Sequence, residues 1–185
     1  MISPLRLYLI RHGRPGAGFA EAVDPGLDEI GREQARTIAE ELSSLGPLLL
    51  ITSPLKRARE TALPFETRWG IAAHVESRIA EIPSPSENLE ERAVWLSRAL
   101  RGRWSDLTSA YQSWRMRLVE FLLACRASTL MTTHFVAINA AVGFATGDDR
   151  LVCFEPDLCS CTVLEVENNS LRVVSLGRQR TTVVR

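Results

Sequence analysis

Residues 5–15 read LRLYLIRHGRP, and the rest of the chain can be interpreted from this stretch. Its first half is a short apolar run, which is typical of a strand buried on both faces of a sheet. The run ends at Arg11-His12-Gly13-Arg14-Pro15, where glycine and proline favour a turn. The carboxyl end of a strand is where open α/β sheets bind ligands. Two guanidinium groups beside an imidazole would fit an anion such as phosphate or a carboxylate, and an exposed basic turn is the alternative.

Length and charge limit the possible classes of protein. The 185 residues fit one domain, residues 1–185, with a full hydrophobic core. Because 22 basic residues balance 22 acidic ones, nothing favours binding to nucleic acid or to a membrane surface. The chain has no run of about 18 apolar residues that would cross a membrane. The first predicted strand begins a few residues after Met1 and leaves no room for a signal peptide ahead of it, so we expect a cytoplasmic protein.

The four cysteines are Cys125, Cys153, Cys159 and Cys161, and no two of them form a CxxC pair. Cys159 and Cys161 are two positions apart on a predicted strand and would lie on the same face. We interpret them as reduced, buried thiols that behave as small apolar side chains, in preference to a zinc site.

The first half of the chain alternates between helix and strand patterns. Asp28 is a suitable N-cap for a helix whose apolar stripe starts with Ile30 and ends before Gly46-Pro47. Residues 48–52 predict a second buried strand, which leads through Ser53-Pro54 into a helix over residues 55–69. Arg57 falls in the first turn of that helix, so it can point to the same sheet edge as His12.

The second half continues the alternation. Residues 72–78 are a weaker strand candidate, and Glu81 lies in the loop that follows. Residues 84–87 (SPSE) resemble a capping box, which predicts a helix with a buried face. A further helix is predicted over residues 108–125, a strand over 129–133, a helix over 135–142 and a closing hairpin over 159–177. The face predicted for the helix after the capping box consists of Leu89, Ala93, Leu96 and Leu100.

This order predicts an α/β fold with a mainly parallel central sheet and helices on both faces. His134 directly follows the strand predicted over residues 129–133. The ends of three predicted strands therefore bring four side chains to one edge of the sheet, namely those of Arg11, His12, Arg57 and His134. The third histidine, His74, falls inside a strand candidate and is interpreted as structural or exposed.

An ordered set of motifs resembles the histidine phosphatases, also called the phosphoglycerate mutase-like superfamily. The set consists of RHG at 11–13, LxxxGxxQA at 27–35, TSPLKRARETA at 52–62, a loop glutamate at 81 and TTH at 132–134. The resemblance implies that His12 is a nucleophile that forms a phosphohistidine, with Glu81 as proton donor to the leaving oxygen. It also implies that Arg11, Arg57 and His134 hold the phosphoryl oxygens.

The implied enzyme hydrolyses a small phosphomonoester without a metal or cofactor. A neutral imidazole is needed for attack, and neighbouring arginines would lower its pKa by like-charge repulsion. Arg14 and Ser53 are further candidates for binding substrate. A protein phosphohistidine phosphatase, a mutase and a catalytically silent phosphate-binding module remain alternatives, and oligomeric state is left open.

The sequence departs from the family pattern at three places. Arg14-Pro15 follows RHG where an acidic residue and a threonine are common, and Phe135 replaces a glycine often found after the second histidine. Residues 82–85 (IPSP) follow Glu81, where a glycine-containing run is frequent. Specificity is expected to come from loop 14–27, from residues 82–110 and from the residues after Gly143.

Overall fold

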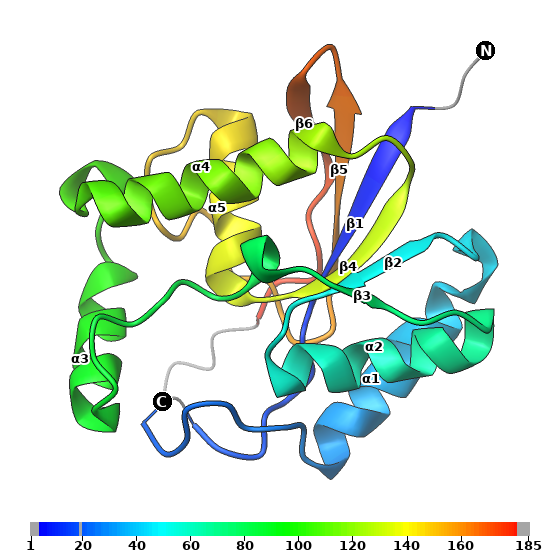
Figure 1. Ribbon diagram of the computed structural model, residues 1–185, viewed down its shortest axis with the longest axis horizontal. Coiled ribbons are helices and arrows are strands. Elements are labelled where there is room, and N and C mark those ends of the chain that lie inside the picture. Colours follow the sequence, from blue (N-terminus) through cyan, green and yellow to red (C-terminus); the bar gives the residue numbers. More distant parts are fainter. Residues whose placement is uncertain (1–3, 19, 181–185) are drawn as a thin grey trace.

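One six-stranded sheet runs through the residues that the computed structural model describes, 4–18 and 20–180 (Figure 1). The strand order is β3-β2-β4-β1-β5-β6, so the N-terminal strand is flanked on both sides. The pairs β1/β4, β2/β4 and β2/β3 are parallel, whereas β1/β5 and β5/β6 are antiparallel. The strands are β1 (Leu5–Arg11), β2 (Leu49–Thr52), β3 (His74–Val75), β4 (Thr129–Thr133), β5 (Cys161–Glu167) and β6 (Ser170–Ser175).

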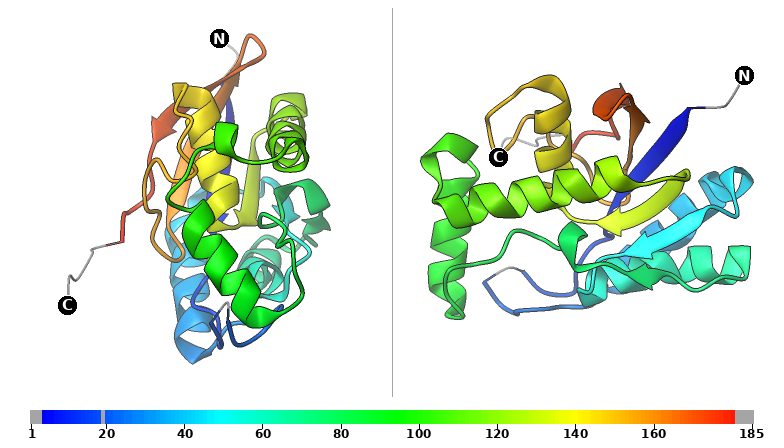
Figure 2. Two further views of the ribbon diagram at one scale, coloured as in Figure 1. Left: turned by 90° about the vertical axis from the view of Figure 1, so that its left-hand side faces the viewer. Right: turned by 45° about the horizontal axis from the view of Figure 1, so that its top comes forward.

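Helices cover both faces of this sheet, as Figures 1 and 2 show. α1 (Glu29–Glu41) and α2 (Lys56–Trp69) pack on one face, and α4 (Ser109–Ala124) and α5 (Phe135–Thr146) pack on the other. α3 (Leu89–Ala99) stands apart from the sheet, on the side of the strand carboxyl ends. Short 3-10 turns occur at Ser43–Leu45, Ser77–Ile79 and Trp104–Asp106.

The period of two along the central strands explains the two cores. Leu9 packs in the cluster with α4 and α5, while its neighbour Ile10 packs in the cluster with α1 and α2. The same alternation separates Met131 from Leu130 on β4. The prediction of an α/β fold with a mainly parallel sheet and helices on both faces is therefore confirmed.

Several predicted boundaries are also confirmed. Asp28 is the N-cap of α1 and accepts a hydrogen bond from the Gly31 N–H through its side chain. The predicted hairpin turn has Asn168 and Asn169 at φ 50° and 58°, a left-handed pair that suits a two-residue turn. Ile30 is a correction, because it is 49% exposed and does not belong to the buried stripe.

The helix predicted from the capping box at residues 84–87 begins later. Asn88 is the N-cap of α3, and its side-chain oxygen accepts the N–H groups of Glu90 and Glu91. Ser84 instead bonds locally, since its hydroxyl donates to the carbonyl of Ser86. The predicted face is only partly buried, and the buried residues of α3 are Arg92 and Ala99.

The thiols differ from the prediction in two respects. Cys159 precedes β5 and has a φ of 49°, so it is not on the same strand as Cys161. All four cysteines are free thiols, but only Cys159 is buried, and Cys125, Cys153 and Cys161 are partly buried. Within the described ranges, no group of three His, Cys, Asp or Glu side chains could hold a metal ion. Among these residues, no helix is long and apolar enough to cross a bilayer.

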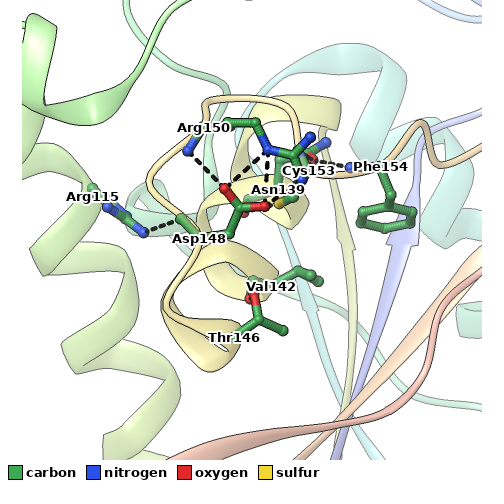
Figure 3. Close-up of polar contacts among 8 residues, drawn as sticks. All are labelled: Arg115, Asn139, Val142, Thr146, Asp148, Arg150, Cys153 and Phe154. Atoms are coloured by element: carbon green, nitrogen blue, oxygen red, sulfur yellow. Dashed lines mark hydrogen bonds and ion pairs between the residues drawn. The ribbon is translucent and has the colours of Figure 1, made fainter.

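A polar network fixes the connection from α5 to β5 (Figure 3). The side-chain oxygen of the buried Asn139 accepts hydrogen bonds from the backbone N–H groups of Cys153 (2.9 Å) and Phe154 (3.1 Å). Asp148 forms an ion pair with Arg150, and Arg115 of α4 donates to the Asp148 carbonyl. This network holds the segment that continues into residues 155–158.

Candidate active site

Three chain segments are joined by hydrogen bonds where β1, β2 and β4 end. The His12 N–H donates to the Thr133 carbonyl (2.9 Å), and the Ser53 N–H donates to the Thr132 carbonyl (3.0 Å). These bonds continue the parallel register of the sheet by one residue beyond each strand. The side chains of the residues just after the strands therefore meet at one edge.

The imidazole of His12 has a defined tautomer. Its Nδ1 lies 2.8 Å from the Gly13 carbonyl oxygen, which can only accept, so Nδ1 carries the proton. Its Nε2 lies 3.2 Å from Nε of Arg57, which can only donate, so Nε2 keeps its lone pair. The geometry thus presents an unprotonated ring nitrogen beside a guanidinium group.

Burial and positive charge keep His12 neutral. The side chain is buried, and burial together with the charge of Arg57 lowers its pKa to about 3, with a smaller effect from Arg11. The predicted like-charge repulsion is present, but loss of solvation is the larger cause. The imidazole is therefore uncharged at neutral pH.

Arg57 comes from the first turn of α2, and loop 14–27 holds it from the other side. Its Nη1 lies 3.8 Å from Oδ1 of Asp24, and the same oxygen accepts the Lys56 N–H at 2.9 Å. One helical turn further on, the hydroxyl of Thr61 donates to the Arg57 carbonyl and accepts the Gly13 N–H at 3.0 Å. The first turn of α2 and the RHG turn are thus fixed to each other.

His134 lies against His12, with ring centroids 5.2 Å apart. It is fully buried, and burial together with the neighbouring His12 and Arg57 lowers its pKa well below the usual value. Its Nε2 is 2.7 Å from the Ser53 hydroxyl, whereas its buried Nδ1 has no hydrogen-bond partner among the described residues. The Ser53 oxygen also accepts the Leu55 N–H, which favours donation of its own proton to His134 Nε2. Nδ1 of His134 would then be a free N–H donor.

Arg11 ends β1 and directly precedes His12. One of its terminal nitrogens donates to the Pro156 carbonyl at 2.8 Å, and its guanidinium carbon lies 5.0 Å from the Phe135 ring centroid. Its buried Nε has no partner among the residues that the structure describes. The aromatic ring therefore supports a guanidinium that still has a donor available.

Glu81 lies in the loop after the 3-10 turn Ser77–Ile79 and reaches the N-terminus of α5. Its carboxyl accepts the backbone N–H groups of Ile82 (3.0 Å) and Val136 (3.2 Å). Burial raises its pKa, although these N–H groups and the arginines at positions 57 and 11 act in the opposite direction. The carboxyl group of Glu81, near Arg57 and Arg11, is therefore easier to protonate than an exposed carboxyl group.

Most of these groups line a cavity of about 700 Å³, whereas His134 is fully buried beside His12 and is not among the lining residues. Arg11, His12, Arg57 and Glu81 line it, as does Arg14, whose Nε donates to Asp28 at 2.5 Å. Ser53 is a correction to the sequence interpretation. It is fully buried, is not among the residues that line the cavity, and its hydroxyl is hydrogen-bonded to His134, so we interpret Ser53 as a residue that positions His134.

Two glycines explain how closely the RHG turn at residues 11–13 packs against the first turn of α1. A Cβ on Gly31 would overlap the carbonyl of Arg14, and a Cβ on Gly13 would overlap the carbonyl of Gly31. Only glycine lets the first turn of α1 approach the RHG turn this closely.

The comparison with protein families agrees with this geometry. The family model for the histidine phosphatase superfamily (branch 1) matches residues 7–179. The chain belongs to the histidine phosphatase superfamily.

Two curated relatives illustrate the similarity in sequence, and each matches less than half of this chain. A glucosyl-3-phosphoglycerate phosphatase of Mycobacterium tuberculosis is 38% identical over 80 residues, which are 41% of this chain and 36% of that protein. Phosphoserine phosphatase 1 of Hydrogenobacter thermophilus is 35% identical over 82 residues, 42% of this chain and 39% of that protein. The chain thus matches little more than a third of the length of these relatives.

Solved structures match nearly the whole superfamily chain in fold. A mycobacterial glucosyl-3-phosphoglycerate phosphatase complexed with VO3 has a TM-score of 0.72 at 21% identity, covering 96% of this chain and 100% of that one. A phosphoserine phosphatase from Entamoeba histolytica, in complex with 3-phosphoglyceric acid, has a TM-score of 0.73 at 19% identity, covering 95% and 98%. These similarities establish the fold.

Two side chains that hold Arg57 and the RHG turn in place were not predicted from the sequence. Thr61 is four residues after Arg57, so the i, i+4 rule would have placed both on one helix face. Asp24 lies in a loop without any periodic pattern, and the only indication was that a buried arginine needs a counter-charge.

Proposed function

We propose that this protein hydrolyses small phosphomonoesters through a phosphohistidine on His12. The observation that carries the proposal is the forced tautomer of His12, whose Nε2 lone pair faces the guanidinium of Arg57 where both residues line the cavity. A neutral imidazole with a fixed lone pair is a ready nucleophile. The names of the curated relatives, which include phosphatases for glucosyl-3-phosphoglycerate and phosphoserine, support the same class of reaction.

In the first step, His12 Nε2 forms a bond to phosphorus and the bond from phosphorus to the ester oxygen breaks. That oxygen leaves with the electron pair and takes a proton from the carboxyl group of Glu81. The raised pKa of Glu81 suits this role, because a general acid must hold its proton near the working pH. The products are the free alcohol and phosphohistidine.

In the second step, a water molecule in the cavity attacks the phosphorus and the bond to Nε2 breaks. Glu81, now a carboxylate, takes a proton from that water, and the imidazole regains its lone pair. The bond from Nδ1–H to the Gly13 carbonyl holds the ring in place through both steps. Orthophosphate is released.

The charge on the phosphoryl oxygens needs fixed donors. Arg57 and Arg11 supply guanidinium groups close to His12, and His134 supplies the Nδ1–H that has no described protein partner. Donors that are held in place before the reaction stabilise the transition state without reorganisation. Ser53 would act as a positioning residue, because its hydroxyl orients His134.

A trapping experiment tests the proposal. Wild type would be mixed with a phosphorus-labelled generic ester, and portions would be quenched in alkali and in acid. We expect label that survives alkali and is lost in acid, because phosphoramidates are acid-labile. His12→Ala should carry no label and release no phosphate, while the matched control His74→Ala, at an exposed histidine, should behave as wild type. Undiminished phosphate release by His12→Ala would refute the proposal.

Independence of a metal and a cytoplasmic location remain predictions from the sequence. Phosphate release should be unchanged after dialysis against EDTA. A loss of activity that Mg²⁺ or Zn²⁺ restores would contradict the first prediction.

A further inference from the structure

The cavity is much larger than a phosphoryl group requires. Its volume of about 700 Å³ lies within the range of pockets that enclose whole organic ligands. Arg11, His12, Arg57 and Glu81 line part of it. The remaining walls come from loop 14–27, α3, the start of α5 and residues 155–158. These walls are where the alcohol part of an ester would lie.

Most of these outer walls are apolar. Leu96 and Leu100 are four residues apart on α3, so they face the cavity from adjacent turns. Phe135 and Leu158 face it from other segments, and Val23 of loop 14–27 remains 59% exposed. Because Val23 lines the cavity as well, it would contact an apolar ligand bound there.

The charged side chains in the same walls balance each other. Arg14 and Arg180 line the outer cavity together with Glu155 and Asp157. Arg14 is already paired with Asp28. The described outer walls therefore offer no excess of positive charge for a second anionic group, such as a carboxylate on the substrate.

We propose that the substrate class is a phosphomonoester of an alcohol with a bulky, mainly apolar tail, and that a second anionic group is disfavoured. This inference rests on the proposed function, since it describes the leaving group of the same reaction. The tail lies between Leu96 and Leu100 of α3 and Val23 of the loop. The recognition is by burial of apolar surface, and the phosphoryl group supplies the charge that the arginines bind.

Three esters of primary alcohols test the proposal with nearly equal leaving-group chemistry. They are propyl phosphate, 3-phenylpropyl phosphate and 3-(phosphonooxy)propanoate, which carries a carboxylate. We expect kcat/KM for the phenylpropyl ester to exceed that of the propyl ester roughly 30-fold, as burial of about 80 Å² of apolar surface would give at about 25 cal/mol per Å². The carboxylate ester should be no better than the propyl ester.

Variants of the apolar walls locate the effect. Leu96→Asn should reduce the phenylpropyl-to-propyl ratio to roughly a tenth of its wild-type value. Val23→Asn should also reduce it, and because Val23 is mostly exposed this change does not depend on tolerance of the core. Val94→Asn is the matched control, since Val94 is two residues from Leu96 on α3 but 71% exposed and outside the cavity. It should keep the wild-type ratio.

The outcomes separate this inference from the proposed function. If propyl phosphate is hydrolysed but the phenylpropyl ester is not preferred, or the carboxylate ester is preferred, the substrate class is wrong and the phosphatase proposal stands. If Val94→Asn lowers the ratio as much as Leu96→Asn, the assignment to these walls is wrong. If no ester is hydrolysed and orthophosphate does not bind, the proposed function itself fails.

Discussion

Acid should destabilise the ligand-free protein more than its His12→Gln variant. His12 is buried as a neutral imidazole, and burial with the charge of Arg57 lowers its pKa to about 3. In the unfolded chain the same side chain takes up a proton near pH 6.5. Protonation of the unfolded chain therefore draws the equilibrium away from the native state as the pH falls. Glutamine cannot titrate, so the variant lacks this contribution.

The sign and size follow from linkage. A folded pKa below the unfolded value gives stability that is fully present above about pH 6.5 and is lost as the pH falls towards 3. At pH 5 the unfolded chain is favoured about 32-fold relative to high pH, because pH 5 lies about 1.5 units below the unfolded pKa of 6.5 and still above the folded pKa of about 3. That factor corresponds to about 2 kcal/mol in the free energy of unfolding.

Urea unfolding in phosphate-free buffer, followed by circular dichroism, measures this difference. The free energy of unfolding would be determined at pH 7.5, 6.5 and 5 for wild type, His12→Gln and the exposed-site control His74→Gln. His134 is present in all three proteins, so its own titration largely cancels in the comparison. Between pH 7.5 and 5, wild type should lose about 2 kcal/mol more than His12→Gln. A difference between the two proteins that stays constant across this range would refute the reasoning that His12 is held neutral.

Three further predictions concern other parts of the site. Glu81→Gln should reduce kcat on alkyl phosphates by about 10²- to 10⁴-fold, but on p-nitrophenyl phosphate by less than about tenfold, because only the poor leaving group needs a proton. Full activity on both esters would point to a phosphohistidine phosphatase instead. Ser53→Ala should reduce kcat/KM roughly tenfold and change the ¹⁵N chemical shifts of His134, because the hydrogen bond that selects the His134 tautomer is lost. Ser53→Thr should restore both, and unchanged shifts in Ser53→Ala would contradict the positioning role of Ser53. Gly31→Ala should lower the free energy of unfolding by about 1–3 kcal/mol in urea melts, because its Cβ would overlap the Arg14 carbonyl, and Gly102→Ala, where a Cβ meets nothing closer than 3.4 Å, should not.

The sheet and the position of its ligand-binding edge could be predicted because both depend on strong local signals. Apolar runs such as residues 5–10 end at glycine or proline, and parallel strands bring their carboxyl ends together. The start of α3 could not be predicted in the same way. Ser84, Ser86 and Asn88 are all acceptable caps, and the choice depends on which backbone groups each side chain reaches.

The residue types at the site were also accessible from the sequence, but their surroundings were not. The motifs placed His12 and Arg57 at one rim, and the hydrogen bond between them agrees with that placement. Burial is a property of the whole fold, so the main cause of the low His12 pKa is absent from any local pattern. The same holds for Ser53, which has the chemistry of a ligand-binding residue but lies behind His134 with no access to the cavity.

The separation of α3 from the sheet has a consequence for how such a protein can diversify (Figure 1). His12, the proposed nucleophile, is anchored to the sheet framework by the hydrogen bond from its N–H to the Thr133 carbonyl. The side chains that would meet the alcohol belong to α3 and to loop 14–27, outside that framework. Loop 14–27 also holds Arg57 through Asp24, so replacing α3 alone with its counterpart from a relative should redirect the proposed phosphatase to another ester while its reactive centre is retained.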